Sequence, residues 1–260
     1  MVQRLASILF TLYLFGSVPI YGFFVLLTAP FPHAVTYRAV QWWIDSVLFL
    51  LRRLCRLGFE VEGCEHVPEG NTVVLMKHSS AWETLAQFRL FPTQTWVLKR
   101  ELMWVPFLGW VLRLLKPIAI DRSGGRAAVQ QVVEQGRKRL AEGFWVVIFP
   151  EGTRVPAGQT RRYGISGALL AAVTGKPIVP VAHNAGEFWP RRGWLKRPGT
   201  IRVRIGPPIP TAGRDPREIT AEAQRWIEGA LAEISEGRAA RAEGGARDRE
   251  GSSEQRMSSE

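Results

Sequence analysis

No charged side chain occurs between Arg4 and Arg38, and this absence constrains the fold more than any other feature of the chain. Residues 8–29 within this stretch are largely apolar and long enough to cross or enter a lipid bilayer. Pro19 lies in the middle of the run, so the sequence leaves open a single span and a kinked, re-entrant hairpin. A cleaved signal peptide is a further alternative, although the run is too long for a typical signal and has no clear small-x-small cleavage site.

A second apolar segment, residues 40–57, combines tryptophan and leucine with Arg52, Arg53 and Arg56. Its position directly after the first run favours an amphipathic helix that lies on a membrane, with its arginines near anionic headgroups. The alternative is an ordinary surface helix packed on the protein core. We therefore predict that residues 1–57 form membrane-anchoring helices.

The chain carries a formal net charge of +11, from 34 Lys and Arg against 23 Asp and Glu. Such a balance predicts a polyanionic partner: nucleic acid, an anionic membrane or a phosphorylated substrate. The apolar N-terminus and the lack of a recognised nucleic-acid-binding motif favour the membrane and argue against nucleic acid. Cys55 and Cys64 belong to no metal-ligand pattern, so the sequence predicts neither a metal site nor a disulfide framework.

From residue 58 onward, strand-like runs alternate with helix-like segments. The expected strands are 72–76, 96–98, 118–120, 144–149, 178–181 and 201–205, and the expected helices are 127–140, 166–173 and 220–234. This alternation predicts an α/β domain over residues 58–235, with a mixed, largely parallel central sheet flanked by helices. Residues 236–260, rich in Gly, Ser, Arg and Glu, are predicted to be a disordered tail.

His78 directly follows the apolar run 72–76, which predicts that it lies at the carboxyl edge of the sheet, where α/β proteins place their sites. Ser79 or Ser80 can cap the helix that follows. On a regular helix His78 and Glu83 would point about 140° apart, so they meet only if His78 precedes the helix and folds back over its first turn. In that geometry Glu83 would hold the ring and His78 would act as a general base. The competing interpretation is a capped helix with a surface histidine.

A second polar cluster follows the strand 144–149 and consists of Glu151, Gly152, Thr153 and Arg154. We expect this turn to expose the Glu151 carboxylate, the Thr153 hydroxyl and the Arg154 guanidinium at the same edge of the sheet. Arginine suits phosphate because its planar fork donates two parallel hydrogen bonds. The competing interpretation is a polar turn with a solvated arginine.

Two further strands end in polar residues. Asp121 and Arg122 follow the strand 118–120, where they contribute to a site, pair with each other, or cap the helix that begins near Arg126. The strand 178–181 contains Pro180 and is followed closely by His183. Because proline is unfavourable in a central strand, we expect an edge position or a bulge there.

These four clusters, in this order, resemble the motifs of the glycerolipid acyltransferase family, and within it the bacterial 1-acyl-glycerol-3-phosphate acyltransferases. The family pattern begins with a histidine, four residues and an acid, which match His78 and Glu83. It continues with a strand that ends in Asp-Arg, a Phe-Pro-Glu-Gly-Thr-Arg block and a hydrophobic strand with proline. The resemblance spans roughly residues 60 to 185, by the order of these motifs. The usual acid in the family is aspartate, so Glu83 is a departure from the pattern.

The resemblance implies a role for each of these residues. His78 would deprotonate the acceptor hydroxyl, and Glu83 would orient His78. Arg122 and Arg154 would bind the phosphate of the acceptor. Glu151, Gly152 and Thr153 would shape the acceptor pocket, and Lys99 would assist with phosphate or headgroups.

The resemblance also implies the reaction and its setting. A fatty acyl group would pass from acyl-CoA or acyl-carrier protein to the sn-2 hydroxyl of lysophosphatidic acid, forming phosphatidic acid without a cofactor. The implied setting is an anionic phospholipid membrane, the inner (cytoplasmic) membrane, with the catalytic domain on its cytoplasmic side. Motifs for the chemistry do not determine the acceptor, so another lysophospholipid, a lyso-amino-acid lipid or glycerol 3-phosphate stays open.

Overall fold

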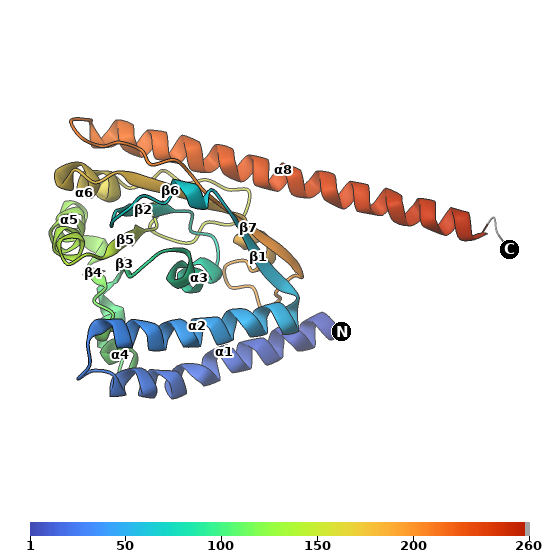
Figure 1. Ribbon diagram of the computed structural model, residues 1–260, viewed down its shortest axis with the longest axis horizontal. Coiled ribbons are helices and arrows are strands. Elements are labelled where there is room, and N and C mark those ends of the chain that lie inside the picture. The colour runs from blue at the N-terminus through green and yellow to red at the C-terminus, as the bar shows by residue number, and fades with distance from the viewer. Residues whose placement is uncertain (258–260) are drawn as a thin grey trace.

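A helical hairpin lies along one side of an α/β domain (Figure 1). This computed structural model describes the backbone of residues 1–257 and the side chains of residues 1–236. The hairpin consists of α1 (Val2–Leu27) and α2 (His33–Cys55). The domain contains the strands β1 (Leu57–Glu62), β2 (Val73–Met76), β3 (Gln94–Lys99), β4 (Ile118–Ile120), β5 (Trp145–Ile148), β6 (Ile178–His183) and β7 (Gly199–Ile205).

The seven strands form one sheet in the order β1-β7-β6-β2-β5-β3-β4. Every neighbouring pair is parallel except β6 and β7. The helices of the domain are α3 (Trp82–Leu90), α4 (Leu108–Leu114), α5 (Arg126–Ala141), α6 (Ser166–Thr174), α7 (Ala185–Phe188) and α8 (Pro216–Met257), with short 3₁₀ turns η1 (Cys64–His66), η2 (Arg100–Trp104) and η3 (Arg122–Gly124). The predicted mixed, largely parallel sheet flanked by helices is confirmed.

The two faces of the sheet carry separate cores, and this explains the continuous apolar run of β2. Val74 and Met76 pack toward α1, α2 and α3, whereas Val73 and Leu75 pack toward α5, α6 and α8. Figure 1 shows the same layers, with α6 and α8 on one side of the strands and α3, α2 and α1 on the other. A parallel strand buried on both faces needs apolar residues at every position, not at alternate ones.

The apolar N-terminal run forms one continuous helix, α1, with Pro19 inside it. No hairpin forms within residues 8–29, because the chain reverses between α1 and α2. Phe10 of α1 and Leu51 of α2 belong to the core that they share with the sheet. By length and composition α1 is the one helix among the described residues suited to crossing a membrane, and 22% of its most apolar window is buried.

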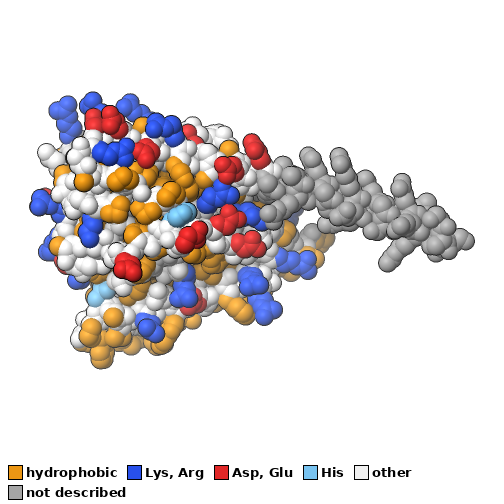
Figure 2. Space-filling model, turned by 45° about the horizontal axis from the view of Figure 1, so that its top comes forward, with side chains coloured by type: hydrophobic (Ala, Val, Ile, Leu, Met, Phe, Trp, Pro, Cys, Tyr) orange, Lys and Arg blue, Asp and Glu red, His pale blue; other side chains and the backbone are white. Residues whose placement is uncertain are grey.

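The outer face of the hairpin is apolar and exposed. It includes Phe15, Phe23 and Phe24 of α1 and Trp42 and Phe49 of α2. In Figure 2 hydrophobic side chains gather at the lower left of the molecule, where Figure 1 places α4 and the turn between α1 and α2. The second predicted segment, α2, packs one face on the core and exposes an apolar face on the other side.

The strand that contains Pro180 is interior, because β6 lies between β2 and β7, so the predicted edge position is wrong. The bulge is confirmed. β6 pairs with β7 at Val181 and Ile205 and forms an isolated bridge from Ile178 to Ile209, so three residues, 206–208, oppose two, 179 and 180. The Pro180 carbonyl accepts from the Gly206 N–H at 2.9 Å. The N–H that proline lacks therefore falls where the ladder with β7 is interrupted.

The C-terminal segment differs from the prediction of a disordered tail. The backbone of α8 continues as a helix to Met257, while residues 258–260 and the side chains from residue 237 lie outside the described residues. The segment 236–257 also contains many Ala, Arg and Glu residues, which are strong helix formers. The prediction of disorder rested on the glycines and serines of the same segment.

Candidate active site

The sheet order brings the chemistry-bearing loops together. β2 lies between β5 and β6, so the segments that leave the carboxyl ends of these three strands meet at one edge of the sheet. His78 follows β2 and precedes α3, Glu151 follows β5, and His183 ends β6. This is the edge at which open α/β sheets bind their ligands.

Glu83 holds the ring of His78. Nδ1 of His78 lies 2.9 Å from Oε1 of Glu83, and the His78 ring stacks on Phe149 with centroids 4.3 Å apart. A ring N–H that donates to a carboxylate places the proton on Nδ1 and leaves Nε2 as the acceptor. Nε2 makes no hydrogen bond with any described residue, and the His78 side chain is 11% exposed. Glutamate in place of the family's aspartate therefore reaches the ring.

The first turn of α3 explains why this contact forms. Oε1 of Glu83 also accepts from the backbone N–H of Ser79 at 2.9 Å and of Ser80 at 2.8 Å. Oγ of Ser80 in turn accepts from the N–H of Trp82 at 3.1 Å. A serine followed three residues later by glutamate has the spacing of a capping box, in which the two side chains satisfy the first donors of a helix. The same cap turns the Glu83 carboxylate toward His78.

The pKa of the Glu83 carboxyl is lowered although its side chain is fully buried. Burial opposes the charge, but His183, His78 and the N–H of Ser80 outweigh it and lower the pKa of the Glu83 carboxyl. Burial lowers the pKa of His183, whose Nε2 donates to the carbonyl of Lys77 at 2.8 Å while its Nδ1 accepts from the N–H of Ala185. Both ring nitrogens of His183 are therefore engaged.

Glu151 is turned inward, so the predicted exposure of its carboxylate is wrong. Oε2 accepts from the backbone N–H of His78 at 3.0 Å, and Oε1 lies 2.7 Å from Nζ of Lys77. Burial raises the pKa of Glu151, with Lys77 acting in the opposite direction. The turn that follows Glu151 also contacts the main chain of His78, because the N–H of Val155 donates to the carbonyl of His78 at 2.8 Å.

The predicted phosphate-binding residues lie around this turn. Arg122 donates from Nη1 to the carbonyl of Gly152 at 2.8 Å, which joins the segment after β4 to the segment after β5. Gly152 has φ +69, a left-handed conformation that favours glycine, and Thr153 and Arg154 beside it are half-buried. Four predicted residues, Arg122, Gly152, Thr153 and Arg154, are thus brought together next to the main chain of His78.

Lys99 and Asp121 are engaged elsewhere. Nζ of Lys99 pairs with Glu101 at 3.1 Å, and its side chain is more than half exposed. Among the described residues Lys99 makes no hydrogen bond or ion pair with the other predicted site residues. Asp121 caps η3 by accepting from the N–H of Ser123 at 2.9 Å and pairs with Arg100 at 3.1 Å, so it neither pairs with Arg122 nor caps α5.

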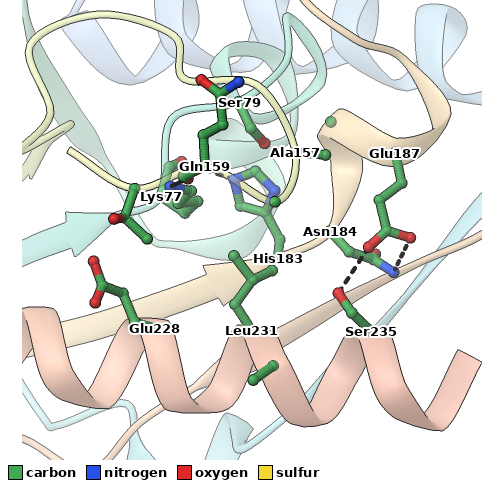
Figure 3. Close-up of a pocket in the computed structure, with 14 residues that line it drawn as sticks. Lys77, Ser79, Ala157, Gln159, His183, Asn184, Glu187, Glu228, Leu231 and Ser235 are labelled. Carbon is green, nitrogen blue, oxygen red and sulfur yellow. Dashed lines mark hydrogen bonds between the residues drawn. The ribbon is translucent and has the colours of Figure 1, made fainter.

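Lys77 and His183 are two residues at this edge whose roles the sequence did not predict. Both border a cavity of about 250 Å³ between the carboxyl edge of the sheet and α8 (Figure 3). Lys77 directly precedes His78, and His183 ends the proline-containing strand. Their positions after buried strands were the one available signal, since their partners come from distant parts of the chain.

Comparison with known proteins establishes the family. A family model described as Acyltransferase matches residues 58–184. The chain is 45% identical over 239 residues to a 1-acyl-sn-glycerol-3-phosphate acyltransferase of Pseudomonas aeruginosa, which covers 90% of this chain and 93% of that protein. It is 30% identical over 182 residues to the human 1-acyl-sn-glycerol-3-phosphate acyltransferase alpha, which covers 69% of this chain and 64% of that protein. The chain belongs to the acyltransferase family, as its motifs predicted.

The fold is also that of a solved acyltransferase. The crystal structure of the 1-acyl-sn-glycerophosphate acyltransferase PlsC from Thermotoga maritima has a TM-score of 0.74 with this chain. The match covers 90% of this chain and 96% of the other at 22% identity. The hairpin and the α/β domain thus belong to a fold already known among these enzymes.

Proposed function

We propose that this enzyme transfers a fatty acyl group from an acyl thioester to the sn-2 hydroxyl of lysophosphatidic acid, forming phosphatidic acid. The observation that carries the proposal is the 2.9 Å contact between Nδ1 of His78 and Glu83, which directs Nε2 away from the carboxylate. The names of the relatives from Pseudomonas aeruginosa and human support the same acceptor. The donor is acyl-CoA or acyl-carrier protein, and no cofactor takes part.

The reaction proceeds by direct attack of the acceptor. Nε2 of His78 takes the proton of the hydroxyl while its oxygen bonds to the thioester carbonyl carbon. Glu83 stabilises the imidazolium that forms. The C–S bond then breaks, and the departing sulfur takes up the proton from His78. The products are an ester and a thiol, and His78 returns to its neutral form.

The acceptor phosphate binds at Arg122 and Arg154. Arg154 directly precedes Val155, whose N–H is bonded to the carbonyl of His78, and Arg122 is bonded to Gly152 in the same turn. Both arginines belong to segments bonded to this turn, and planar guanidinium groups suit a phosphate that lies near the reacting hydroxyl. Gly152 and Thr153 of the same turn would shape the acceptor pocket, and Lys99, which pairs with Glu101, would add positive charge for phosphate or headgroups.

The exposed face of the hairpin supports a position of this site at an anionic lipid surface. Its exposed outer face carries large apolar side chains, Phe15, Phe24 and Trp42 among them, and Arg52 and Arg53 follow in the last turn of α2. Apolar side chains next to cations suit the boundary between acyl chains and headgroups. We assign the protein to the inner (cytoplasmic) membrane, with the α/β domain on the cytoplasmic side.

An apolar cavity of about 340 Å³ is suited to an acyl chain. It lies between the hairpin, α3 and α4, and its lining includes Gly22, Thr84, Leu85, Phe107 and Val111. Thr84 and Leu85 directly follow Glu83 on α3, so the cavity begins next to the residue that orients the base. The proposal is that the chain of one substrate enters this cavity.

Replacing Val111 by phenylalanine tests the cavity. The larger ring narrows it, so kcat/KM for long acyl chains is expected to fall about tenfold relative to short ones. Rates are measured with donors of increasing chain length and, separately, with acceptors of increasing chain length. Arg113→Ala, an exposed change on the same helix, is the matched control. An unchanged chain-length profile in both series contradicts the assignment.

A panel of acceptors tests the proposed reaction. Purified protein in vesicles is supplied with one acyl thioester and with lysophosphatidic acid, a neutral lysophospholipid or glycerol 3-phosphate. Lysophosphatidic acid is expected to give the highest kcat/KM, because its phosphate pairs with both arginines. Arg154→Gln is expected to remove most of that preference. If the neutral lysophospholipid and lysophosphatidic acid gave equal kcat/KM, the assignment of lysophosphatidic acid as the acceptor would be contradicted.

A further inference from the structure

A buried ion pair lies directly behind the base. Lys77 and Glu151 are 2% and 3% exposed, and their charged atoms lie 2.7 Å apart. We infer that Lys77 and Glu151 are positioning residues that hold the main chain of His78 in place, and that Glu151 does not contact the acceptor. This inference rests on the proposed function and reassigns one residue that the family resemblance places in the acceptor pocket.

Both oxygens of Glu151 are already engaged. Oε2 accepts from the N–H of His78 at 3.0 Å, and Oε1 faces Nζ of Lys77. The carboxylate side chain has no exposed surface. To bind a hydroxyl of the acceptor, Glu151 would have to release Lys77 or the main chain of His78. Either change leaves a buried charge or a buried N–H unpaired, which is costly.

Lys77 connects the pair to the neighbouring strand. Its N–H donates to the carbonyl of Val181 at 3.0 Å, and its carbonyl accepts from Nε2 of His183 at 2.8 Å. Its ammonium group also lies 3.4 Å from the carbonyl of Gln159, which lines the same cavity (Figure 3). The peptide that precedes His78 is therefore held on one side by β6 and on the other by the segment after β5.

The main chain of His78 is held equally closely. Glu151 accepts from its N–H, and Val155 donates to its carbonyl. Glu83 separately holds the ring. The two glutamates thus hold different parts of His78. Glu83 sets the orientation of the imidazole, and Glu151 sets the position of the backbone that carries it. A displacement of about 1 Å at a reacting group can cost about 10²-fold in rate.

The test compares Lys77→Met, Glu151→Gln and the double variant in the full-length enzyme. Each single change is expected to lower kcat about 10²-fold with the KM for the acceptor unchanged, because the base is displaced but the acceptor contacts remain. The double variant removes both charges and keeps an amide oxygen for the N–H of His78. It is expected to be about tenfold more active than Lys77→Met, which leaves a buried charge unpaired.

Lys116→Met, Glu142→Gln and their double variant form the matched control, because this pair is exposed and lies away from His78. The controls are expected to match the wild type. If Glu151 bound the acceptor, Glu151→Gln would raise KM, and the double variant would be at least as impaired as Glu151→Gln. That pattern overturns the inference. The kinetics use whichever acceptor gives the highest kcat/KM in the acceptor panel. The test of Lys77 and Glu151 therefore does not depend on whether that acceptor is lysophosphatidic acid.

Hydrogen exchange gives a second measurement that does not depend on turnover. In Glu151→Ala the N–H of His78 loses its acceptor, so peptides that contain residue 78 are expected to exchange faster than in the wild type. Peptides from α5 serve as the internal reference for global unfolding. Unchanged exchange at residue 78 with unchanged exchange in α5 overturns the inference. Faster exchange confined to residue 78 supports it.

Discussion

Replacing His78 by alanine is expected to lower kcat by about 10² to 10⁴-fold, the range for loss of a positioned general base. The change removes the ring that contacts Glu83 at 2.9 Å and whose second nitrogen makes no hydrogen bond with any described residue. The KM for the acceptor is expected to stay near that of the wild type, since Arg122 and Arg154, which we propose bind the phosphate, are untouched. Steady-state kinetics with vesicle-bound enzyme provide the measurement.

The fold should survive this substitution. Glu83 keeps two backbone donors, from Ser79 and Ser80, so its buried charge is not left without partners. His66→Ala, which alters a histidine of η1 outside the site, is the control and is expected to retain full activity. Wild-type turnover by His78→Ala would exclude His78 as the base. Membrane binding, measured by flotation with vesicles, is expected to be the same in all three proteins.

Replacing Glu83 by glutamine is expected to lower kcat by about 10² to 10⁴-fold while preserving the cap of α3. The amide oxygen can still accept from Ser79, Ser80 and the His78 ring, so the shape of the site is kept. What is lost is the negative charge that stabilises the imidazolium. Glu83→Asp keeps the charge but is shorter by one bond of about 1.5 Å, so its activity is expected to lie between those of the wild type and Glu83→Gln.

Stability against pH provides the companion measurement for Glu83. The pKa of this carboxyl is lower in the folded protein than in the unfolded chain. Its charge therefore stabilises the fold fully above the unfolded value of about 4.3, and this contribution is lost as the pH falls through the lower folded value. Glu83→Gln lacks the contribution at every pH. The difference in denaturation midpoint between the two proteins should accordingly shrink in acid, and a difference that grows in acid contradicts this account.

The local parts of the site were predictable from the sequence. The order of strands and polar clusters predicted that His78 and Glu151 leave the carboxyl ends of buried strands. The contact between His78 and Glu83 depends on five consecutive peptide units, and the spacing of Ser80 and Glu83 contains the cap that produces it. Such features follow from residue type and short-range geometry, so the local sequence is enough to predict them.

The inward position of Glu151 was not predictable in the same way. Its partners, Lys77 and the main chain of His78, lie 73 residues or more away in sequence and become neighbours only because β2 and β5 pair. His183 reaches Lys77 across 106 residues because β6 lies on the other side of β2. A turn of the form Pro-Glu-Gly gives no sign of which way its carboxylate points.

For the proposed base, the sequence alone determined the histidine, the acid five residues later and the helical cap between them, because all three lie within residues 78–83. It also determined the apolar helix at the N-terminus and the alternation that builds the sheet. Only the tertiary structure decided which charged groups face the substrate and which support the base. The order of strands determines which side chains from distant parts of the sequence are buried next to each other. A buried charge requires a partner of opposite charge or a hydrogen bond.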